Sequence, residues 1–87
     1  MNLNNKKLII LKKPEKYLQK LPLNDQKRII KALKLLITSP NLCDIKPLKG
    51  RSEWRLIVGD YRVLYIDDIT NNSYVVTAIK SRGDIYK

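Results

Sequence analysis

Eighty-seven residues suffice for one small domain and leave no room for a second hydrophobic core or a cofactor-binding half. The chain carries 18 lysines and arginines against 8 aspartates and glutamates, a net charge of +10, and it contains no histidine. The lack of histidine rules out histidine-based catalysis, and the single Cys43 rules out an intrachain disulfide. Together they argue against a protein-built zinc site. The positive charge favours a polyanionic partner, either nucleic acid or an anionic membrane.

The membrane is the less favoured of these partners. The apolar run near the N-terminus covers only residues 8–11, which is too short for a signal sequence or a membrane span. There is no repeat, low-complexity tract or Gly/Ser linker, so we expect residues 1–87 to form one domain. We expect a cytoplasmic protein with no membrane partner.

The first elements in chain order are a strand and a short helix. Residues 7–12 predict a strand that carries residues 8–11 as a buried apolar run. Pro14 suits the first turn of a short helix, and Pro22 limits that helix. The inner stripe of this helix is expected to contain Tyr17, Leu18 and Leu21.

A longer helix follows. Asn24 is expected to be its N-cap, with Asp25 in the first turn, and Ser39-Pro40 ends it. Its inner face is predicted to contain Ile29, Ile30, Leu33, Leu36 and Ile37. Its other side carries Lys27, Arg28, Lys31 and Lys34. Such a basic row is more typical of a solvated helix face than of a nucleic-acid contact.

The second half of the chain reads as strands. Residues 53–58, 61–66 and 74–79 are rich in β-branched and aromatic side chains. Gly59-Asp60 matches a two-residue hairpin loop, and residues 67–73 form a longer polar turn. The order β-α-α-β-β-β predicts an α+β fold, with two N-terminal helices on one face of a mostly antiparallel sheet.

The hairpin loop also fixes a register. It pairs Val58 with Tyr61, Ile57 with Arg62, and Arg55 with Leu64. One face of the hairpin then holds Arg55, Ile57, Arg62 and Leu64. The other, expected to be the core face, holds Trp54, Leu56, Val58, Tyr61, Val63 and Tyr65. Neighbouring arginines repel each other. That cost is tolerable where an anion binds, although plain exposure to solvent would also relieve most of it.

The candidate functional residues of the second half are cationic, with one phenol: Lys46, Lys49, Arg55, Arg62, Arg82 and Tyr86. The planar guanidinium fork matches phosphate, so these residues point to phosphate binding more than to generic acid binding. By composition alone, however, a strand with two arginines is more often an ordinary solvated surface. An alternative interpretation of residues 82–86 is a loop with a local ion pair and a tucked tyrosine.

Three stretches resemble the RelE-type toxins of type II toxin–antitoxin pairs, within the RelE/ParE superfamily. They are Lys-Pro-Leu-Lys-Gly at residues 46–50, Trp-Arg-Leu-Ile-Val-Gly-Asp-Tyr-Arg-Val-Leu-Tyr at 54–65, and the ending at 79–86. The resemblance spans nearly the whole chain and implies the same fold. It also implies a ribosome-dependent endoribonuclease that cuts mRNA in the decoding site and halts translation.

The resemblance assigns phosphate binding and catalysis to Arg55, Arg62, Arg82 and Tyr86, with Lys49 as a weaker match. The sequence also departs from the family. Many relatives carry a second basic residue where this chain has Ile57, and histidine where it has Ser81. The YoeB-like branch pairs a glutamate, at the position of Lys46, with a histidine. That acid–base pair is absent here. Reduced or lost nuclease activity is therefore an open alternative.

Without histidine, the roles must be divided differently. Cleavage of RNA by its own 2′-hydroxyl needs a proton acceptor, stabilisation of the phosphorane and a proton donor, but no metal. The hypothesis is that Arg62 and Arg82 stabilise the phosphorane, Arg55 clamps substrate phosphate and Tyr86 is the acid–base group. Lys46 or Lys49 could serve as the base instead. The ribosome would supply in-line geometry.

Two other functions remain open: inhibition of DNA gyrase as in ParE-like toxins, and a non-catalytic RNA-binding or repressor-complex module. The expected partners are a cognate, net acidic antitoxin, the ribosome and its mRNA. Operator DNA is expected only through the toxin–antitoxin complex. No cofactor is expected.

Overall fold

The chain folds as the predicted α+β structure, in which two helices pack on a mostly antiparallel sheet; the sheet has five strands where the sequence predicts four. The computed structural model describes residues 6–82. In chain order its elements are β1 (Lys7–Ile10), α1 (Lys12–Gln19), α2 (Leu23–Thr38), the 3₁₀ helix η1 (Pro40–Leu42), β2 (Ile45–Pro47), β3 (Trp54–Val58), β4 (Tyr61–Asp68) and β5 (Ser73–Ser81).

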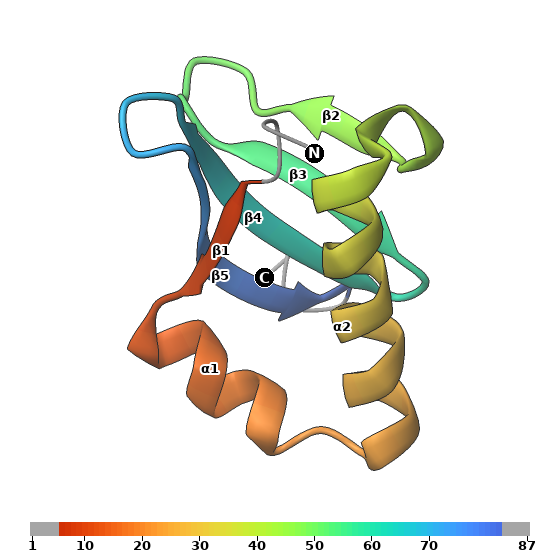
Figure 1. The fold of residues 1–87 in the computed structure, drawn as a ribbon. Coiled ribbons are helices and arrows are strands. Elements are labelled where there is room, and N and C mark those ends of the chain that lie inside the picture. Colours follow the sequence, from red (N-terminus) through yellow and green to blue (C-terminus); the bar gives the residue numbers. More distant parts are fainter. Residues whose placement is uncertain (1–5, 83–87) are drawn as a thin grey trace.

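The strands lie in the order β1-β5-β4-β3-β2, with β1 parallel to β5 and the other neighbours antiparallel (Figure 1). β2 is an addition to the predicted element order. It has three residues and includes Pro47, so it shows no alternating pattern that would mark it as a strand. Its place at the edge of the sheet accommodates the missing N–H of the proline.

The predicted hairpin register is confirmed. Val58 lies opposite Tyr61, Ile57 opposite Arg62, and Arg55 opposite Leu64. Gly59, in the loop, adopts a φ of +57°, which an L side chain reaches only with strain. The loop residue and the period of two together therefore determine which side chains share a face of the sheet.

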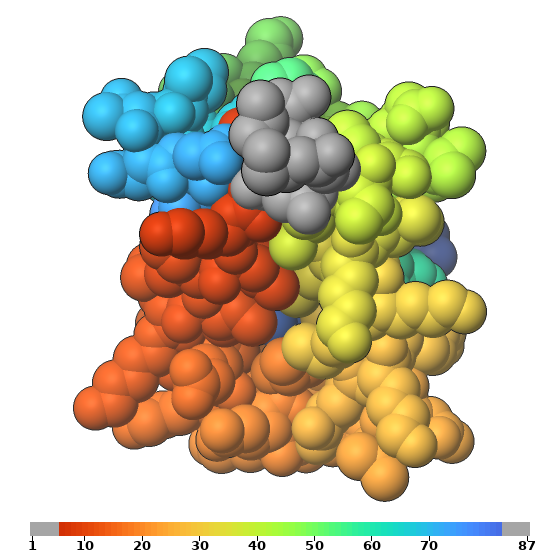
Figure 2. Space-filling view, in the orientation of Figure 1, coloured from red at the N-terminus to blue at the C-terminus, as the bar shows by residue number. Residues whose placement is uncertain are grey.

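The core lies between the sheet and the two helices. Leu18 of α1 and three fully buried residues of α2 pack against one face of the strands. The buried cluster consists of Leu18, Ile29, Leu33, Leu36, Leu56, Val58, Val63, Tyr65, Tyr74, Val76 and Ile79. From this side, β1, α1 and α2 make up most of the visible surface (Figure 2).

The N-terminal strand differs from its prediction. It ends at Ile10 because the chain turns into α1 at Lys12, where Pro14 occupies the first turn as expected. The run 8–11 is not buried throughout, since Ile9 is 42% exposed and Leu11 44% exposed. β1 is an edge strand with only one face on the core, so alternate side chains remain in solvent.

The start of α2 also differs from its prediction. Pro22 is the N-cap and Asn24 lies inside the first turn, where the expected Asp25 is also found. The carbonyl of Pro22 accepts the backbone N–H groups of Asp25 and Gln26, each at 3.0 Å. The Gln26 amide donates to the carbonyl of Leu21 at 2.8 Å and so ties α2 to the end of α1.

Trp54 was expected in the core and is instead 39% exposed. Its position opposite the buried Tyr65 is the predicted one. α2 contacts the hairpin end of β3 through Arg28 at Gly59 and Asp25 at Tyr61, while Trp54 is at the opposite end of that strand. The alternation of side chains along β3 determines which face of the sheet Trp54 lies on. Whether that side chain is buried depends on how far α2 extends over this face.

Candidate phosphate-binding site

Cationic side chains gather on the face of the sheet opposite the helices. Directly opposed residues of neighbouring strands share a face, with Cβ atoms roughly 5 Å apart. Lys46 lies opposite Arg55, and Arg62 lies opposite Lys80. Because Arg55 and Arg62 alternate with the buried Leu56 and Val63, this face is the one without helices. The predicted arginine face is therefore confirmed, with lysines on both of its flanks.

A hollow of about 210 Å³ lies on this face, which we call the cation pocket. Its lining consists of Leu48, Arg51, Arg55, Arg62, Leu64 and Lys80. Four of these six residues are cations and none is acidic. Leu64, only 9% exposed, supplies an apolar surface beneath the charges. A small cavity with several positive groups and no carboxylate in its lining suits an anion.

Arg55 carries the clearest sign of an incomplete hydrogen-bond set. Its Nε is buried and has no hydrogen-bond partner among residues 6–82. A buried donor without a partner costs about 1–3 kcal/mol, and more when the group is charged. An oxyanion in the cation pocket would accept this hydrogen bond and recover that cost.

Arg62 is held at the hairpin turn. Its Nη1 donates to the carbonyl oxygens of Gly59 and Tyr61, both at 2.9 Å. The guanidinium has five N–H donors, so Nη2 and Nε keep donors available to a ligand. Because these hydrogen bonds already hold Nη1, the Arg62 side chain loses less conformational entropy when an anion binds.

Glu53 is the acidic group that the sequence reasoning missed. Its carboxylate pairs with Arg51 and accepts a hydrogen bond from the Thr77 hydroxyl. Its side chain is 12% exposed, whereas that of Arg51 is 61% exposed. Thr77 is the extra residue of a β-bulge between β4 and β5, and its hydroxyl also lies 3.3 Å from the Leu64 carbonyl. Glu53 therefore holds Arg51 at the cation pocket from a fixed position on the sheet.

The helix side of the molecule supports the hairpin that carries Arg62. The Tyr61 hydroxyl donates to the Asp25 carboxylate of α2 at 2.7 Å, and this hydrogen bond is the main reason that the pKa of Tyr61 rises to about 12. A Cβ on Gly59 would lie 2.5 Å from Nη2 of Arg28. α2 thus anchors both sides of the turn.

The predicted site residues are only partly brought together. Arg55 and Arg62 line the cation pocket, and Lys46 lies beside Arg55 without lining it. Lys49 is exposed in the turn after β2 and lies outside the lining. The exposed Arg82 also lies outside it; its backbone N–H donates to the Asp60 carbonyl at 2.6 Å, so it starts beside the hairpin turn.

Tyr86, the expected acid–base group, lies outside the described residues. The structure adds Lys80 and Arg51 to the site. Lys80 could have been found by extending the last predicted strand by one residue beyond Ile79 and following the alternation. Within residues 6–82, no three or more aspartate, glutamate or cysteine side chains gather where they could hold a metal ion. The helices of this part of the chain also lack the length and hydrophobicity of a membrane-spanning segment.

A comparison with protein families gives one match over most of the chain. The family described as the ParE toxin of the type II toxin–antitoxin system, parDE, matches residues 8–86. No curated protein matches the sequence significantly.

Solved structures match the fold. A chain of the archaeal RelE–RelB complex from Pyrococcus horikoshii OT3 is 27% identical with a TM-score of 0.78, covering 91% of this chain and 97% of that one. A chain of the Methanococcus jannaschii RelB–RelE antitoxin–toxin complex is 24% identical with a TM-score of 0.75, covering 91% and 95%. A chain of the intact E. coli RelBE complex is 17% identical with a TM-score of 0.74, covering 87% and 95%. The last two similarities concern the fold alone.

Proposed function

Because the chain belongs to the ParE toxin family of type II toxin–antitoxin systems, within the RelE/ParE superfamily, we propose that it is a toxin that cleaves mRNA on the ribosome. The observation that carries this proposal is the cation pocket. It places Arg55, Arg62 and Lys80 together on a sheet face that has no helix packed on it. A helix-free face leaves room for a polynucleotide backbone.

In this proposal, phosphate is the group that the cation pocket recognises. Arg55 clamps a substrate phosphate through its unpartnered Nε, and Arg62 stabilises the charge that develops on the phosphorane. Arg82 is a second stabiliser, located beside the hairpin turn. Arginine remains protonated at neutral pH, so it acts as a charge and a donor rather than as a base.

Lys80 compensates for one departure of this chain from the pattern of the RelE-type toxins that it resembles. Relatives with a second basic residue two positions after Arg55 would place it where this chain has Ile57. Ile57 and Lys80 flank Arg62 from opposite sides, in β3 and β5. A cation at Lys80 therefore restores positive charge next to Arg62 from the other neighbouring strand. This supports a retained activity despite Ile57.

Proton transfer is assigned to Tyr86, with Lys46 or Lys49 as the alternative base. None of these is a strong acid–base group at neutral pH. The ribosome is therefore proposed to contribute the geometry, by bending mRNA so that its 2′-hydroxyl lies in line with the leaving 5′-oxygen. Lys46 and Lys49 lie exposed around β2, where they can contact the flanking backbone of the mRNA.

A cognate antitoxin is the proposed inhibitor. The matching structures from M. jannaschii and E. coli are RelB–RelE toxin–antitoxin complexes. A basic chain of charge +10 suits a net acidic partner. Operator binding is proposed only for the toxin–antitoxin complex, and the cytoplasm is the compartment in which ribosome and antitoxin would be met.

A gyrase-directed activity is the second candidate, since the matching family is ParE. That activity would work through a protein surface and would not need the phosphate chemistry of the cation pocket. The two candidates therefore differ in their dependence on Arg55 and Arg62.

The test is controlled expression of the wild-type chain and of Arg62→Ala, with Lys20→Ala as a matched exposed-cation control. Wild type and Lys20→Ala are expected to arrest growth and to cut ribosome-bound mRNA within codons. Arg62→Ala is expected to lose about 100-fold in cleavage rate, as for removal of one oxyanion donor. Growth arrest with a DNA-damage response and intact mRNA would instead establish gyrase inhibition. Absence of toxicity in the wild type would favour the non-catalytic module.

A further inference from the structure

The loop between β2 and β3 places Arg51 at the cation pocket. The Leu48 N–H donates to the Glu53 carbonyl and the Arg51 N–H donates to the Leu48 carbonyl, each at 3.1 Å. Gly50 adopts the left-handed φ of +73° within this turn. The backbone of residues 48–53 is therefore closed on itself, and it brings the side chains of Leu48 and Arg51 to the lining of the pocket.

Glu53 is anchored by the sheet rather than by this loop. One of its carboxylate oxygens accepts a hydrogen bond from the Thr77 hydroxyl of β5, and the other pairs with Nη2 of Arg51. Because β4 lies between β3 and β5, the Glu53 side chain reaches across one strand to make the first of these contacts. The Glu53 side chain is 12% exposed and that of Arg51 is 61% exposed. Glu53 is thus the fixed member of the ion pair, and Arg51 is the member that it orients.

The ion pair orients Arg51 without filling the cation pocket. Glu53 lies outside the lining of the pocket, whereas Arg51 belongs to it. Among the four cations of that lining, Arg51 alone pairs with a carboxylate within residues 6–82. Its guanidinium carries five N–H donors, so Nη1 and Nε retain donors for a ligand after Nη2 has bonded to Glu53.

Arg51 and Arg62 are held at opposite ends of β3. Arg62 donates to the carbonyls of Gly59 and Tyr61 in the turn that follows this strand, and Arg51 pairs with Glu53, the residue that precedes it. The five residues of β3 span about 16 Å at the rise of an extended chain. A single phosphate group is much smaller than this span. Two guanidinium groups held at these places therefore suit two phosphates of one polynucleotide backbone.

We propose that Arg51 binds a second substrate phosphate, which flanks the phosphate bound at Arg55 and Arg62, and that Glu53 is the positioning residue for Arg51. The inference rests on the proposed function for the identity of the substrate as RNA. Since the charges of Arg51 and Glu53 offset each other, the pair contributes oriented hydrogen-bond donors rather than net charge. The pocket then recognises the spacing of phosphates along a strand and not only their charge.

A purely electrostatic role for Glu53 predicts the opposite result. A carboxylate beside an anion site repels the anion, so its removal would strengthen phosphate binding. If Glu53 positions Arg51, the same removal weakens phosphate binding, because the guanidinium loses its anchor. The direction of the change in Glu53→Gln therefore separates the two roles.

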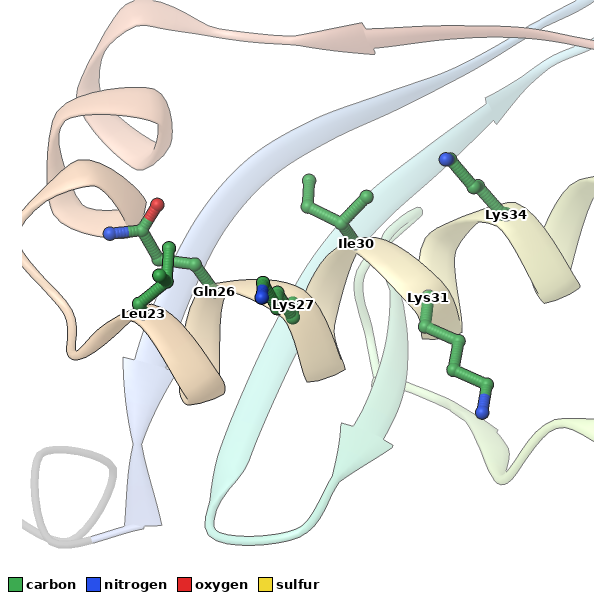
Figure 3. Close-up of a pocket in the computed structure, with 6 residues that line it drawn as sticks. All are labelled: Leu23, Gln26, Lys27, Ile30, Lys31 and Lys34. Atoms are coloured by element: carbon green, nitrogen blue, oxygen red, sulfur yellow. The ribbon is translucent and has the colours of Figure 1, made fainter.

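A cation on the other side of the molecule provides the matched control. A second hollow, of about 370 Å³, runs along α2, and its lining consists of Leu23, Gln26, Lys27, Ile30, Lys31 and Lys34 (Figure 3). In that view the Lys31 side chain extends away from the helix. α2 packs on the sheet face opposite the cation pocket. Lys31→Ala therefore removes one positive charge and leaves the cation pocket intact.

The test is an NMR titration of the full chain with 2′-O-methyl trinucleotides, which cannot be cleaved. One probe has two phosphate linkages, and two further probes of the same bases have one of these linkages replaced by a neutral methylphosphonate. Wild type and Lys31→Ala are expected to bind the fully charged probe about fivefold more tightly than either half-neutral probe. Arg51→Ala and Glu53→Gln should bind it no more than about twofold more tightly than one of them. The double variant should match Arg51→Ala, because Glu53 acts through Arg51.

Thr77→Val is a second variant that keeps both charges and removes the anchor of Glu53. It should also reduce the discrimination between probes, and Thr77→Ser should restore it; thermal unfolding checks that each variant is folded. Tighter binding by Glu53→Gln, or undiminished discrimination in Arg51→Ala, would overturn the inference. Equal binding of all probes by wild type would overturn it as well. The probes require neither a ribosome nor cleavage, so these outcomes are distinct from a failure of the nuclease proposal.

Discussion

The two faces of the sheet come from the same strands and hold opposite kinds of side chain. Under the helices, Leu56 is 1% exposed and Val63 is fully buried. One residue away on each strand, Arg55 and Arg62 line the cation pocket. Because successive side chains alternate, stability and ligand chemistry occupy separate layers of one hairpin. The comparison implies that substitutions on the two faces will affect different measurements.

The largest effect on stability is expected at the covered face. Leu33→Ala removes a fully buried side chain from α2 and should lower the free energy of unfolding by about 2–5 kcal/mol. Denaturant unfolding measures this change. Leu35→Ala, in the same helix at a 38% exposed position, is the control and should cost less than about 1 kcal/mol. Equal losses at both positions would break the assignment of α2 faces.

Substitutions on the helix-free face of the sheet are expected to affect mRNA cleavage more than stability. Lys80→Ala should reduce mRNA cleavage by about 10- to 100-fold, because it removes a cation opposite Arg62, and leave unfolding unchanged. Lys80→Arg should retain most of the activity. Cleavage kinetics on programmed ribosomes provide the measurement. A Lys80→Ala protein with normal cleavage would remove Lys80 from the site.

The hairpin turn contacts α2 on one face and carries Arg62 on the other. A substitution in this turn should therefore change both the stability and the rate of mRNA cleavage. Gly59→Ala places a Cβ at a φ of +57°, which costs about 1–2 kcal/mol, and pushes Arg28 aside. Gly50→Ala, with a φ of +73° and no atom within 4 Å of its Cβ, is the matched control for backbone strain alone. Thermal unfolding of both variants isolates the Arg28 contact. The rate of mRNA cleavage, which depends on Arg62 beside this turn, should fall only in the Gly59 variant.

The smallest effect is expected from the Tyr61–Asp25 hydrogen bond, through its pH dependence. A folded-state pKa of about 12 exceeds the ordinary tyrosine value near 10, so this stabilisation is complete below pH 10 and is lost as the pH rises toward 12. Burial also raises the pKa of Tyr65 and Tyr74, which adds to the alkaline loss. Tyr61→Phe should cost about 1 kcal/mol at neutral pH and flatten the alkaline slope. Unfolding measured between pH 8 and 12 would show it; an unchanged slope would contradict it.

Much of the fold follows from local sequence. Gly59 in the loop and the period of two on each side determine the register of β3 and β4, and with it the face of Arg55 and Arg62. The apolar spacing of α2 likewise predicts its buried residues. These features depend on near neighbours in the chain, so a pattern in the sequence is enough to find them.

The rest depends on distant contacts. Lys80 reaches Arg62 only through the pairing of β4 with β5, which a bulge at Leu64/Tyr65 shifts by one residue. Burial of Trp54 depends on how far α2 extends over the sheet. Asn24 loses its predicted role because the Pro22 carbonyl already accepts the first N–H groups of the helix. Alternation along the last strand predicts the face on which Lys80 lies. Its position opposite Arg62, the exposure of Trp54 and the start of α2 cannot be read from a period in the sequence.

The parallel pairing of β1 with β5 sets an order of assembly during synthesis. β1 is made first, yet among the strands of residues 6–82 it pairs only with β5, the last of them, which also brings Lys80. A nascent chain that lacks β5 leaves β1 unpaired and one wall of the cation pocket missing. Completion of the sheet and completion of the cation pocket are thus one event, and a translation product that lacks β5 has neither.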